Sequence, residues 1–478
     1  PNILQYPVCM FGALKAGCVV VNCNPLYTAR ELQFQLADSG ASAIVIVENF
    51  AHVLEAVLRN TDIKHVVVTS VGDLLGFPKN ILVNFVLRKI KKMIPTYDLP
   101  TKVKFLSAMK QGSLAPFRPV RVQQDDLAFL QYTGGTTGVS KGAMLTHRNI
   151  LANVLQAHAW IKPHCKEGEE LVITALPLYH IFALTANCFC YFRFGSKNIL
   201  IINPKDLKGF IKEISKYPFT AITGVNTLYN ALLNHKDFNK VDFSCLRISL
   251  GGGMAVQKSV ADKWKSVTGV PLIEAYGLTE TSPAVTINPL NLKEYNGSIG
   301  LPLPSTEVVV RNEKGKDCPV GEPGELCVRG PQVMKGYYNR PDETAKVIMS
   351  DGFLRTGDIA VMDSQGFFKI VDRKKDMILV SGFNVYPNEV EEVASMHPGV
   401  LEVAAVGIPN PKSGEVVKLF VVKKDPELTK EEVISHCRTG LVSYKIPQSI
   451  EFRESLPKTN VGKILRRELR NQTLKALD

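Results

Sequence analysis

The feature that most constrains the fold is an alternation of short apolar runs with helical patterns in the first half of the chain. Residues 43–47 and 65–68 are apolar runs, and residues 51–59 between them have helical spacing. Continuous apolar runs predict buried strands, and strands that alternate with helices predict a parallel sheet covered on both faces. The same rhythm continues in later runs, at residues 171–176, 221–224 and 246–250. We therefore expect an α/β protein with a large N-terminal domain of several sheets.

The pattern changes from about Val308, where short strands with Gly and Pro turns dominate, as in residues 321–330. This texture predicts a β-rich subdomain over about residues 300–371 within a large domain of residues 1–371. A charged run at residues 372–376 then separates two apolar stretches, which is equally typical of a hinge and of a solvated surface turn. Beyond it we expect a small, mobile α+β domain over residues 377–478, in the order strand, helix, strand, strand, helix.

The net charge indicates which class of partner the protein binds, and the cysteines indicate its redox environment. Lys and Arg total 57 and Asp and Glu total 45, which gives a net charge of +12 and favours anionic partners. The aromatic residues are not interleaved with basic runs, so we do not expect nucleic acid to be a partner. The 10 cysteines include no C-x-x-C pair, which disfavours zinc and fits a reducing cytoplasm. The apolar stretches are too short to span a bilayer.

The strongest local signal is the segment 132–142, which follows the apolar strand 127–131. Glycines let a backbone approach phosphate oxygens closely, while hydroxyls, amide N–H groups and a lysine satisfy them. The segment is not a Walker A loop, because Ser140 precedes Lys141 instead of following it. We interpret it as a phosphate-binding loop, against the alternative of a flexible turn. Its predicted contacts are Tyr132, Thr133, Gly134, Gly135, Thr136, Thr137, Gly138 and Lys141.

This segment resembles the phosphate loop of the adenylate-forming superfamily, which includes acyl-CoA synthetases, luciferases and the adenylation domains of peptide synthetases. Further segments resemble the other motifs of that family in its order, at residues 276–281, 355–358, 372–376 with 381–387, and 457–464. The stretch from Asp351 to Glu391 is most similar to the signature of bacterial long-chain fatty acid–CoA ligases. The family usually has several tens more residues before Pro1, so we expect this chain to be an N-terminally truncated fragment.

The resemblance implies a two-step reaction. A fatty carboxylate attacks the α-phosphate of ATP, releasing pyrophosphate and leaving an acyl-adenylate, and the thiolate of CoA then attacks the acyl carbon and expels AMP. Mg²⁺ is the implied cofactor, and ATP, CoA and a long-chain fatty acid are the implied partners. One alternative is a fatty acyl-AMP ligase that passes the acyl group to a carrier protein. Another is a non-catalytic, membrane-associated binder of fatty acid or nucleotide. The oligomeric state is open, with a homodimer as one option.

The resemblance also assigns catalytic roles to particular residues. Both steps concentrate negative charge, so fixed cations should accelerate them. Lys463 is the candidate for holding the carboxylate and the α-phosphate together, and Lys141 adds charge at the phosphate loop. Glu280 and Thr133 are candidate Mg²⁺ ligands, because a hard cation prefers oxygen. His180 lies in an apolar run that the resemblance places beside the acyl site, although a lone histidine there is more often a core residue.

The remaining predicted contacts concern the nucleotide and the moving domain. Tyr276 should stack on adenine, and Asp358 should accept hydrogen bonds from the ribose hydroxyls, with Arg373 nearby. Lys375 should change partners when the hinge turns, and the loop of Gly382 should serve the CoA step. The other predicted contacts are Gly251, Gly252, Gly253, Gly277 and Thr279.

Residues 79–94 form a separate signal, because they are basic and apolar at helical spacing. Such a segment can lie on an anionic membrane surface, which would give peripheral contact with the cytoplasmic membrane face. The more ordinary interpretation is a surface helix packed on the large domain.

Overall fold

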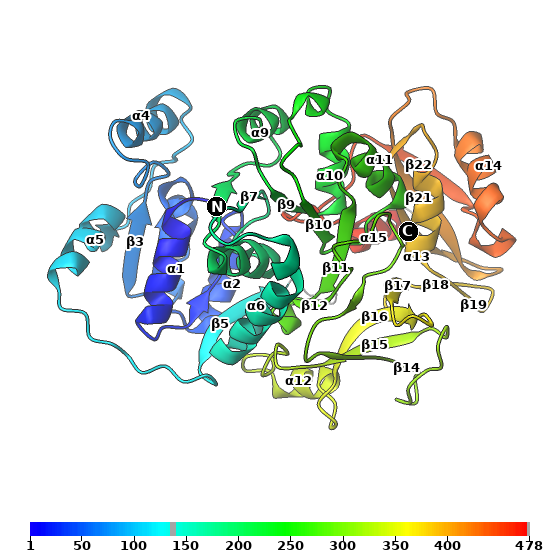
Figure 1. The fold of residues 1–478 in the computed structure, drawn as a ribbon, viewed down its shortest axis with the longest axis horizontal. Coiled ribbons are helices and arrows are strands. Elements are labelled where there is room, and N and C mark those ends of the chain that lie inside the picture. The colour runs from blue at the N-terminus through cyan, green and yellow to red at the C-terminus, as the bar shows by residue number, and fades with distance from the viewer. Residues whose placement is uncertain (134–139, 476–478) are drawn as a thin grey trace.

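The computed structural model describes residues 1–133 and 140–475. Their strands form five sheets. Figure 1 shows a seven-stranded sheet in the middle of the molecule, with a small parallel sheet from the N-terminal part of the chain on the left and another sheet from the C-terminal part on the right. The mixed α/β architecture predicted from the sequence is confirmed.

The sheet at the N-terminal end is parallel throughout. Ile44 and Ile46 pack on the apolar core there, whereas Val45 on the opposite face is 47% exposed, so this strand is not buried on both faces as the apolar run suggested. The helix expected over 51–59 ends early, at Glu55, and a 3-10 turn follows. The elements of this region are α2 (Ala29–Ser39), β2 (Ala43–Val47), α3 (Ala51–Glu55), β3 (His65–Thr69), α4 (Lys79–Phe85), β4 (Lys102–Lys104) and α5 (Phe105–Leu114).

A second three-stranded sheet carries the two ends of the predicted phosphate loop. Strand β5 lies between β1, which is parallel to it, and β6, which is antiparallel. The register pairs Thr133 with Lys141, so these two residues face each other at the strand ends. Phe129 and Leu145 anchor the sheet in a core with the flanking helices. The elements are α1 (Gln5–Lys15), β1 (Val20–Val21), β5 (Leu127–Thr133), β6 (Lys141–Thr146) and α6 (His147–Ile161).

The seven-stranded sheet combines five strands that are parallel to one another with two further strands at one edge, each of which is antiparallel to its inner neighbour. In spatial order the strands are β13 (Leu301–Pro302), β12 (Ala284–Ile287), β11 (Leu272–Gly277), β10 (Ile248–Gly252), β9 (Ala221–Gly224), β7 (Leu171–Thr174) and β8 (Lys197–Leu200). The helices of this region are α7 (Ile181–Ala183), α8 (Tyr191–Arg193), α9 (Leu207–Ile214), α10 (Asn226–Leu233) and α11 (Lys258–Thr268), with a π-helix at Leu184–Cys190. Parallel strands end at a common edge, where ligands of such sheets bind.

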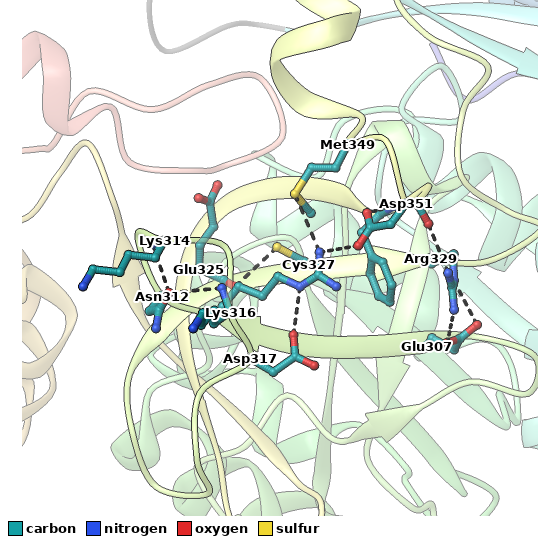
Figure 2. Close-up of polar contacts among 12 residues, drawn as sticks. Glu307, Asn312, Lys314, Lys316, Asp317, Glu325, Cys327, Arg329, Met349 and Asp351 are labelled. Carbon is teal, nitrogen blue, oxygen red and sulfur yellow. Dashed lines mark hydrogen bonds and ion pairs between the residues drawn. The ribbon is translucent and has the colours of Figure 1, made fainter.

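The β-rich region predicted from about Val308 is present as an antiparallel four-stranded sheet of β14 (Glu307–Arg311), β15 (Gly324–Arg329), β16 (Leu354–Met362) and β17 (Phe368–Arg373). Helix α12 (Pro341–Val347) lies between β15 and β16 in the chain. Arg311 pairs with Asp317 and Asp351, and Figure 2 shows Arg329 paired with Glu307. Both guanidinium groups also lie 4.5 Å from the centre of the Phe353 ring. Stacking of this kind adds to ion pairs that are individually weak at a surface.

Besides the predicted strand, helix, strand, strand and helix, the C-terminal unit, residues 377–475, contains a second strand before the first helix and a strand and a helix after the last one, which makes eight strands and α-helices. They are β18 (Ile378–Val380), β19 (Phe383–Val385), α13 (Pro387–Ser395), β20 (Val400–Asn410), β21 (Gly414–Lys423), α14 (Lys430–Gly440), β22 (Ser449–Arg453) and α15 (Arg466–Lys475). The strands form one five-stranded sheet with a core of its own. Within the described ranges, no helix is long and apolar enough to cross a membrane.

Candidate active site

A cavity of about 1930 Å³ lies where the seven-stranded sheet, β6, the β16–β17 hairpin and the C-terminal unit meet. Segments far apart in the sequence converge on it. The predicted site residues that line it are Tyr132, Thr133, Lys141, His180, Gly252, Gly253, Tyr276, Gly277, Thr279, Glu280, Asp358, Arg373, Lys375 and Lys463. Five predicted contacts fall outside the described residues, namely Gly134, Gly135, Thr136, Thr137 and Gly138.

Lys463 reaches the cavity from a tight turn that precedes α15. The Thr459 N–H donates to the Lys463 carbonyl at 2.7 Å, and the Gly462 N–H donates to the Thr459 carbonyl at 2.9 Å. On the opposite wall, Gly253 leaves room for the lysine, because a Cβ there would lie 3.3 Å from Lys463 Cε. The absence of a side chain at this position therefore lets the lysine stem pass.

The electrostatic surroundings of Lys463 are mixed. Burial, helped by the nearby Arg373, lowers the pKa of the ammonium to about 8, while Asp358 and Glu280 oppose that shift. Burial, with a smaller contribution from Lys463, lowers the pKa of His180 to about 3. The imidazole is therefore neutral near pH 7 and can act through hydrogen bonds but not as a cation. The lysine is the charged member of this pair.

Tyr276 and Asp358, predicted for the adenine and the ribose, lie side by side. The Tyr276 hydroxyl donates to Asp358 Oδ2 at 2.6 Å, although the residues are separated by 82 positions in the chain. Arg373 pairs with Asp358 across the β16–β17 hairpin, with 3.4 Å between Nε and Oδ1. Burial raises the pKa of Asp358, and Arg373, Tyr276 and Lys463 counter that rise. A carboxylate so oriented can accept hydrogen bonds from a vicinal diol.

Glu280 and Lys141 are held by two residues that the sequence did not single out. The Tyr337 hydroxyl donates to Glu280 Oε1 at 2.7 Å. The ammonium of Lys141 forms an ion pair with Glu343 of α12 and lies 5.1 Å from the centre of the Tyr337 ring. That ion pair, together with Lys346, lowers the pKa of Glu343 to about 2. A phosphate that binds Lys141 must therefore compete with a carboxylate.

Two predicted contacts are not brought to the cavity. Gly251 is covered from the other side of β10, since a Cβ there would lie 2.7 Å from Val256 Cγ2. Gly382 lies in the exposed turn between β18 and β19, with a φ of +83°. In this arrangement the glycine therefore does not line the cavity.

The charged run at 372–376 is neither wholly solvated nor wholly buried. Residues 373–375 are exposed, but Asp372 is fully buried, and burial raises its pKa to about 6. Arg466 of α15, which the sequence analysis did not single out, donates to Asp372 at 3.2 Å and to both oxygens of Glu391 at 2.8 and 2.6 Å. The predicted hinge is thus tied to the segment that carries Lys463.

The cavity also extends into the core between α6 and the seven-stranded sheet, where its lining is mostly apolar. The apolar residues of this arm are Ala157, Ile161, Phe182, Cys190, Ile248, Leu250, Ile287 and Leu290. A buried carboxyl, Glu274, lines the cavity as well, and its Oε1 accepts the Val256 N–H at 3.1 Å. Burial raises its pKa to about 8. A glutamate inside an otherwise apolar strand was the one sequence signal for it.

Comparison with known proteins agrees with this geometry. The sequence profile of the AMP-binding enzyme family matches residues 1–338, and that of the AMP-binding enzyme C-terminal domain matches residues 389–463. The chain therefore belongs to the AMP-binding, adenylate-forming enzyme family, as its motifs predict.

Within this family its relatives include long-chain-fatty-acid–CoA ligases. That of Escherichia coli O6:H1 is 59% identical over 478 residues, which is 100% of this chain and 85% of the relative. That of Bacillus subtilis is 42% identical and covers 98% of this chain and 84% of the relative. Among solved structures, the anthranilate CoA ligase AuaEII in complex with anthranoyl-AMP matches with a TM-score of 0.85 at 26% identity, covering 98% of this chain and 85% of that one. ATP-bound MatB from Rhodopseudomonas palustris matches with a TM-score of 0.83 at 28% identity, and the match covers 98% of this chain and 86% of MatB.

Proposed function

We propose that the protein is an ATP-dependent long-chain fatty acid–CoA ligase. A carboxylate oxygen of the fatty acid bonds to the α-phosphorus of ATP as pyrophosphate leaves. The thiolate sulfur of CoA then bonds to the acyl carbon as AMP leaves. The observation that carries the proposal is the convergence of Lys463, Glu280, Tyr276 and Asp358 on one cavity. The ligase relatives over the whole chain support the same reaction.

In the first step, Lys463 supplies a fixed positive charge between the attacking carboxylate and the α-phosphate. Two anions approach each other there, so an ammonium placed in advance lowers the barrier. Asp358 binds the ribose hydroxyls and Tyr276 provides an aromatic face for adenine. Lys463→Ala should abolish adenylation while thioester formation from preformed acyl-adenylate survives. An equal loss of both steps would contradict this role.

Mg²⁺ fits the donor set of this cavity as a companion of ATP. Glu280 and Thr133 would hold it with oxygen atoms, and the metal would neutralise charge on the phosphates. Within the ranges that the structure describes, no group of three or more His, Cys, Asp or Glu residues could hold a metal by itself. This agrees with an ion that keeps phosphate and water ligands, because Mg²⁺ dehydrates reluctantly.

The apolar arm supports a long acyl chain as the substrate. Burying a methylene group contributes about 0.8 kcal/mol, so a deep apolar channel favours long chains over short ones. The neutral His180 lies at the start of this arm, where it can donate or accept a hydrogen bond at the carboxyl end of the acid.

The second step requires the C-terminal unit to turn, in the domain scheme of residues 1–371, 372–376 and 377–478. Lys463 would leave the cavity and the loop of Gly382 would approach it, with Lys375 exchanging partners at the pivot. The buried Asp372 beside three exposed cations supports a pivot with one anchored end. Lys375→Pro should slow thioester formation more than adenylation, because proline restricts backbone rotation.

A CoA-dependent AMP-formation assay across fatty acids of graded length tests the function. We expect pyrophosphate release with oleate and ATP, and AMP release that CoA stimulates. Pyrophosphate release without a CoA effect would favour an acyl-AMP ligase that serves a carrier protein. No ATP–pyrophosphate exchange with any acid would leave only a non-catalytic binder.

A peripheral membrane contact is a second part of the proposal, and α4 carries it. The side chains of Phe77, Ile81, Leu82, Phe85, Ile90 and Met93 are between 54% and 84% exposed. A helix packed on the large domain would bury such residues, so the exposed face disfavours the ordinary interpretation. Lys79, Lys89, Lys91 and Lys92 have no carboxylate partner among the described residues, and residues 74–97 contain no acidic side chain.

Apolar side chains flanked by lysines fit the interface of an anionic bilayer on the cytoplasmic side. Reversing Lys91 and Lys92 to Glu should weaken cosedimentation with phosphatidylglycerol vesicles and leave phosphatidylcholine vesicles unaffected. Reversing the exposed Lys314 and Lys316 is the matched control. Equal binding by both variants would reject the contact. The homodimer stays a prediction. Analytical ultracentrifugation measures the oligomeric state and tests it.

A further inference from the structure

Helix α10 makes two hydrogen bonds to the C-terminal unit that the reaction scheme has not used. The Thr227 hydroxyl donates to the Gly462 carbonyl at 2.9 Å. One helical turn further along, the Asn230 side-chain amide donates to the Leu401 carbonyl at 2.8 Å. Both acceptors are main-chain atoms, one in the lysine loop and the other in β20. The contacts therefore depend on where the backbone of the C-terminal unit lies and not on its side chains.

The contact at Thr227 is directly coupled to the catalytic lysine. Gly462 precedes Lys463 in the chain, and its φ of +86° is a conformation that favours glycine. A Cβ on Gly462 would lie 2.8 Å from Thr227 Oγ1, so the loop can approach the helix this closely only without a side chain. The helix thus fixes the backbone from which the ammonium extends.

Charges at the same interface act in both directions, since Glu392 of the C-terminal unit attracts Lys258 of α11. Burial lowers the pKa of Lys263 on α11, and Lys424 of the C-terminal unit lowers it further. Two cations that face each other repel, so this part of the contact favours separation. The neutral hydrogen bonds from α10 act against that repulsion.

We propose that Thr227 and Asn230 are positioning residues that form a latch, which holds Lys463 in the adenylating orientation and opens before the CoA step. This inference rests on the proposed function and on the turning of the C-terminal unit. The latch does not contact the reacting atoms. It sets the equilibrium between the orientation that adenylates and the orientation that forms the thioester.

The two half-reactions provide a measure of that equilibrium. If each half-reaction runs in one orientation, the ratio of their rates is proportional to the equilibrium constant, whichever orientation predominates. Losing a neutral hydrogen bond shifts such a constant about fivefold. The two bonds have separate acceptors, so a double variant should shift it about 25-fold.

The experiment compares Thr227→Val, Asn230→Leu and the double variant with the unaltered protein. Adenylation is measured as ATP–pyrophosphate exchange with oleate, and thioester formation is measured from preformed oleoyl-adenylate and CoA. Valine has the shape of threonine without the hydroxyl, and Thr227→Ser restores the donor as the matched control. We expect the adenylation-to-thioester ratio to fall about fivefold in each single variant and to recover in Thr227→Ser.

Each other outcome has a clear meaning. An unchanged ratio in Thr227→Val and Asn230→Leu, with adenylation intact in the unaltered protein, overturns the latch. A raised KM for ATP with an unchanged ratio also overturns it, because both residues line the cavity and would then act on the nucleotide. If the unaltered protein catalyses no exchange, the proposed function fails instead, and the two failures are thereby distinguished.

Discussion

Lys463 should lose its charge within the pH range of an ordinary assay, and adenylation should decline with it. Burial lowers the pKa of this ammonium from 10.5 to about 8. One pKa unit corresponds to about 1.4 kcal/mol, so enclosing the charged lysine opposes folding by about 3 kcal/mol at pH 7. In the proposed function, this unfavourable contribution accompanies the placement of a cation where the fatty carboxylate and the α-phosphate meet.

The assay is pyrophosphate release with oleate over a range of pH. The kcat/KM for ATP reports the groups of the free enzyme, so it should be level up to about pH 8 and fall about tenfold per pH unit above it. At pH 9.5 about one-thirtieth of the plateau value should remain. Thioester formation from preformed oleoyl-adenylate is the internal comparison, because the proposed function gives Lys463 no part in that step.

Replacing the lysine with a methionine of similar length gives an independent check on the same reasoning. The folded pKa lies below the unfolded one, so the unaltered protein gains stability as the pH rises from about 8 to 10.5. Lys463→Met has no ionisable group at this position, so its stability should not rise over that pH range. At pH 7 it should be more stable than the unaltered protein by about 3 kcal/mol in urea unfolding, while adenylation is lost. A level kcat/KM up to pH 10, or a variant less stable than the parent at pH 7, would refute the reasoning.

Three further changes test other contacts of the site. Gly253→Ala places a Cβ 3.3 Å from Lys463 Cε, so pyrophosphate release should fall at least about tenfold. The control Gly269→Ala has a similar φ of +75° and no atom within 4 Å, so it should lower stability alone. Glu274→Gln removes a carboxyl whose pKa burial raises to about 8, so its advantage in thermal stability should grow from about pH 5 to pH 8. An advantage independent of pH would contradict that explanation. Tyr337→Phe deletes the hydroxyl that donates to Glu280, the proposed Mg²⁺ ligand, so half-maximal rate should need about tenfold more Mg²⁺. An unaltered Mg²⁺ dependence would show that the hydroxyl is dispensable.

Local patterns in the sequence predicted many of the strands and helices and most of the described residues that were expected at the site and that line the cavity. Alternating apolar runs predicted the parallel strands, and the short strands with Gly and Pro turns after Val308 predicted a β-rich subdomain, whose antiparallel pairing the structure adds. A short motif contains each of the residues Tyr276, Asp358 and Lys463. Such a motif can be recognised from adjacent residues, without knowledge of the tertiary structure. The strand at 43–47 was misjudged because an apolar run does not report whether both faces are covered.

Contacts between distant segments could not be derived in the same way. Tyr337, Glu343 and Arg466 are ordinary residues in their local sequence and gain a role only from partners far along the chain. Thr227 likewise has no distinguishing feature in its local sequence, and only the packed structure shows that its hydroxyl donates to the Gly462 carbonyl.

The chemical groups of this protein, and much of the order of its strands and helices, follow from the amino-acid sequence, because local structure depends largely on neighbours in the chain. Which groups share a cavity, which charges are buried and which predicted glycine lies outside the cavity lining depend on how distant segments pack together. Burial and distance are properties of the packed chain, and they set the pKa of Lys463, the solvent exposure of α4 and the reach of α10.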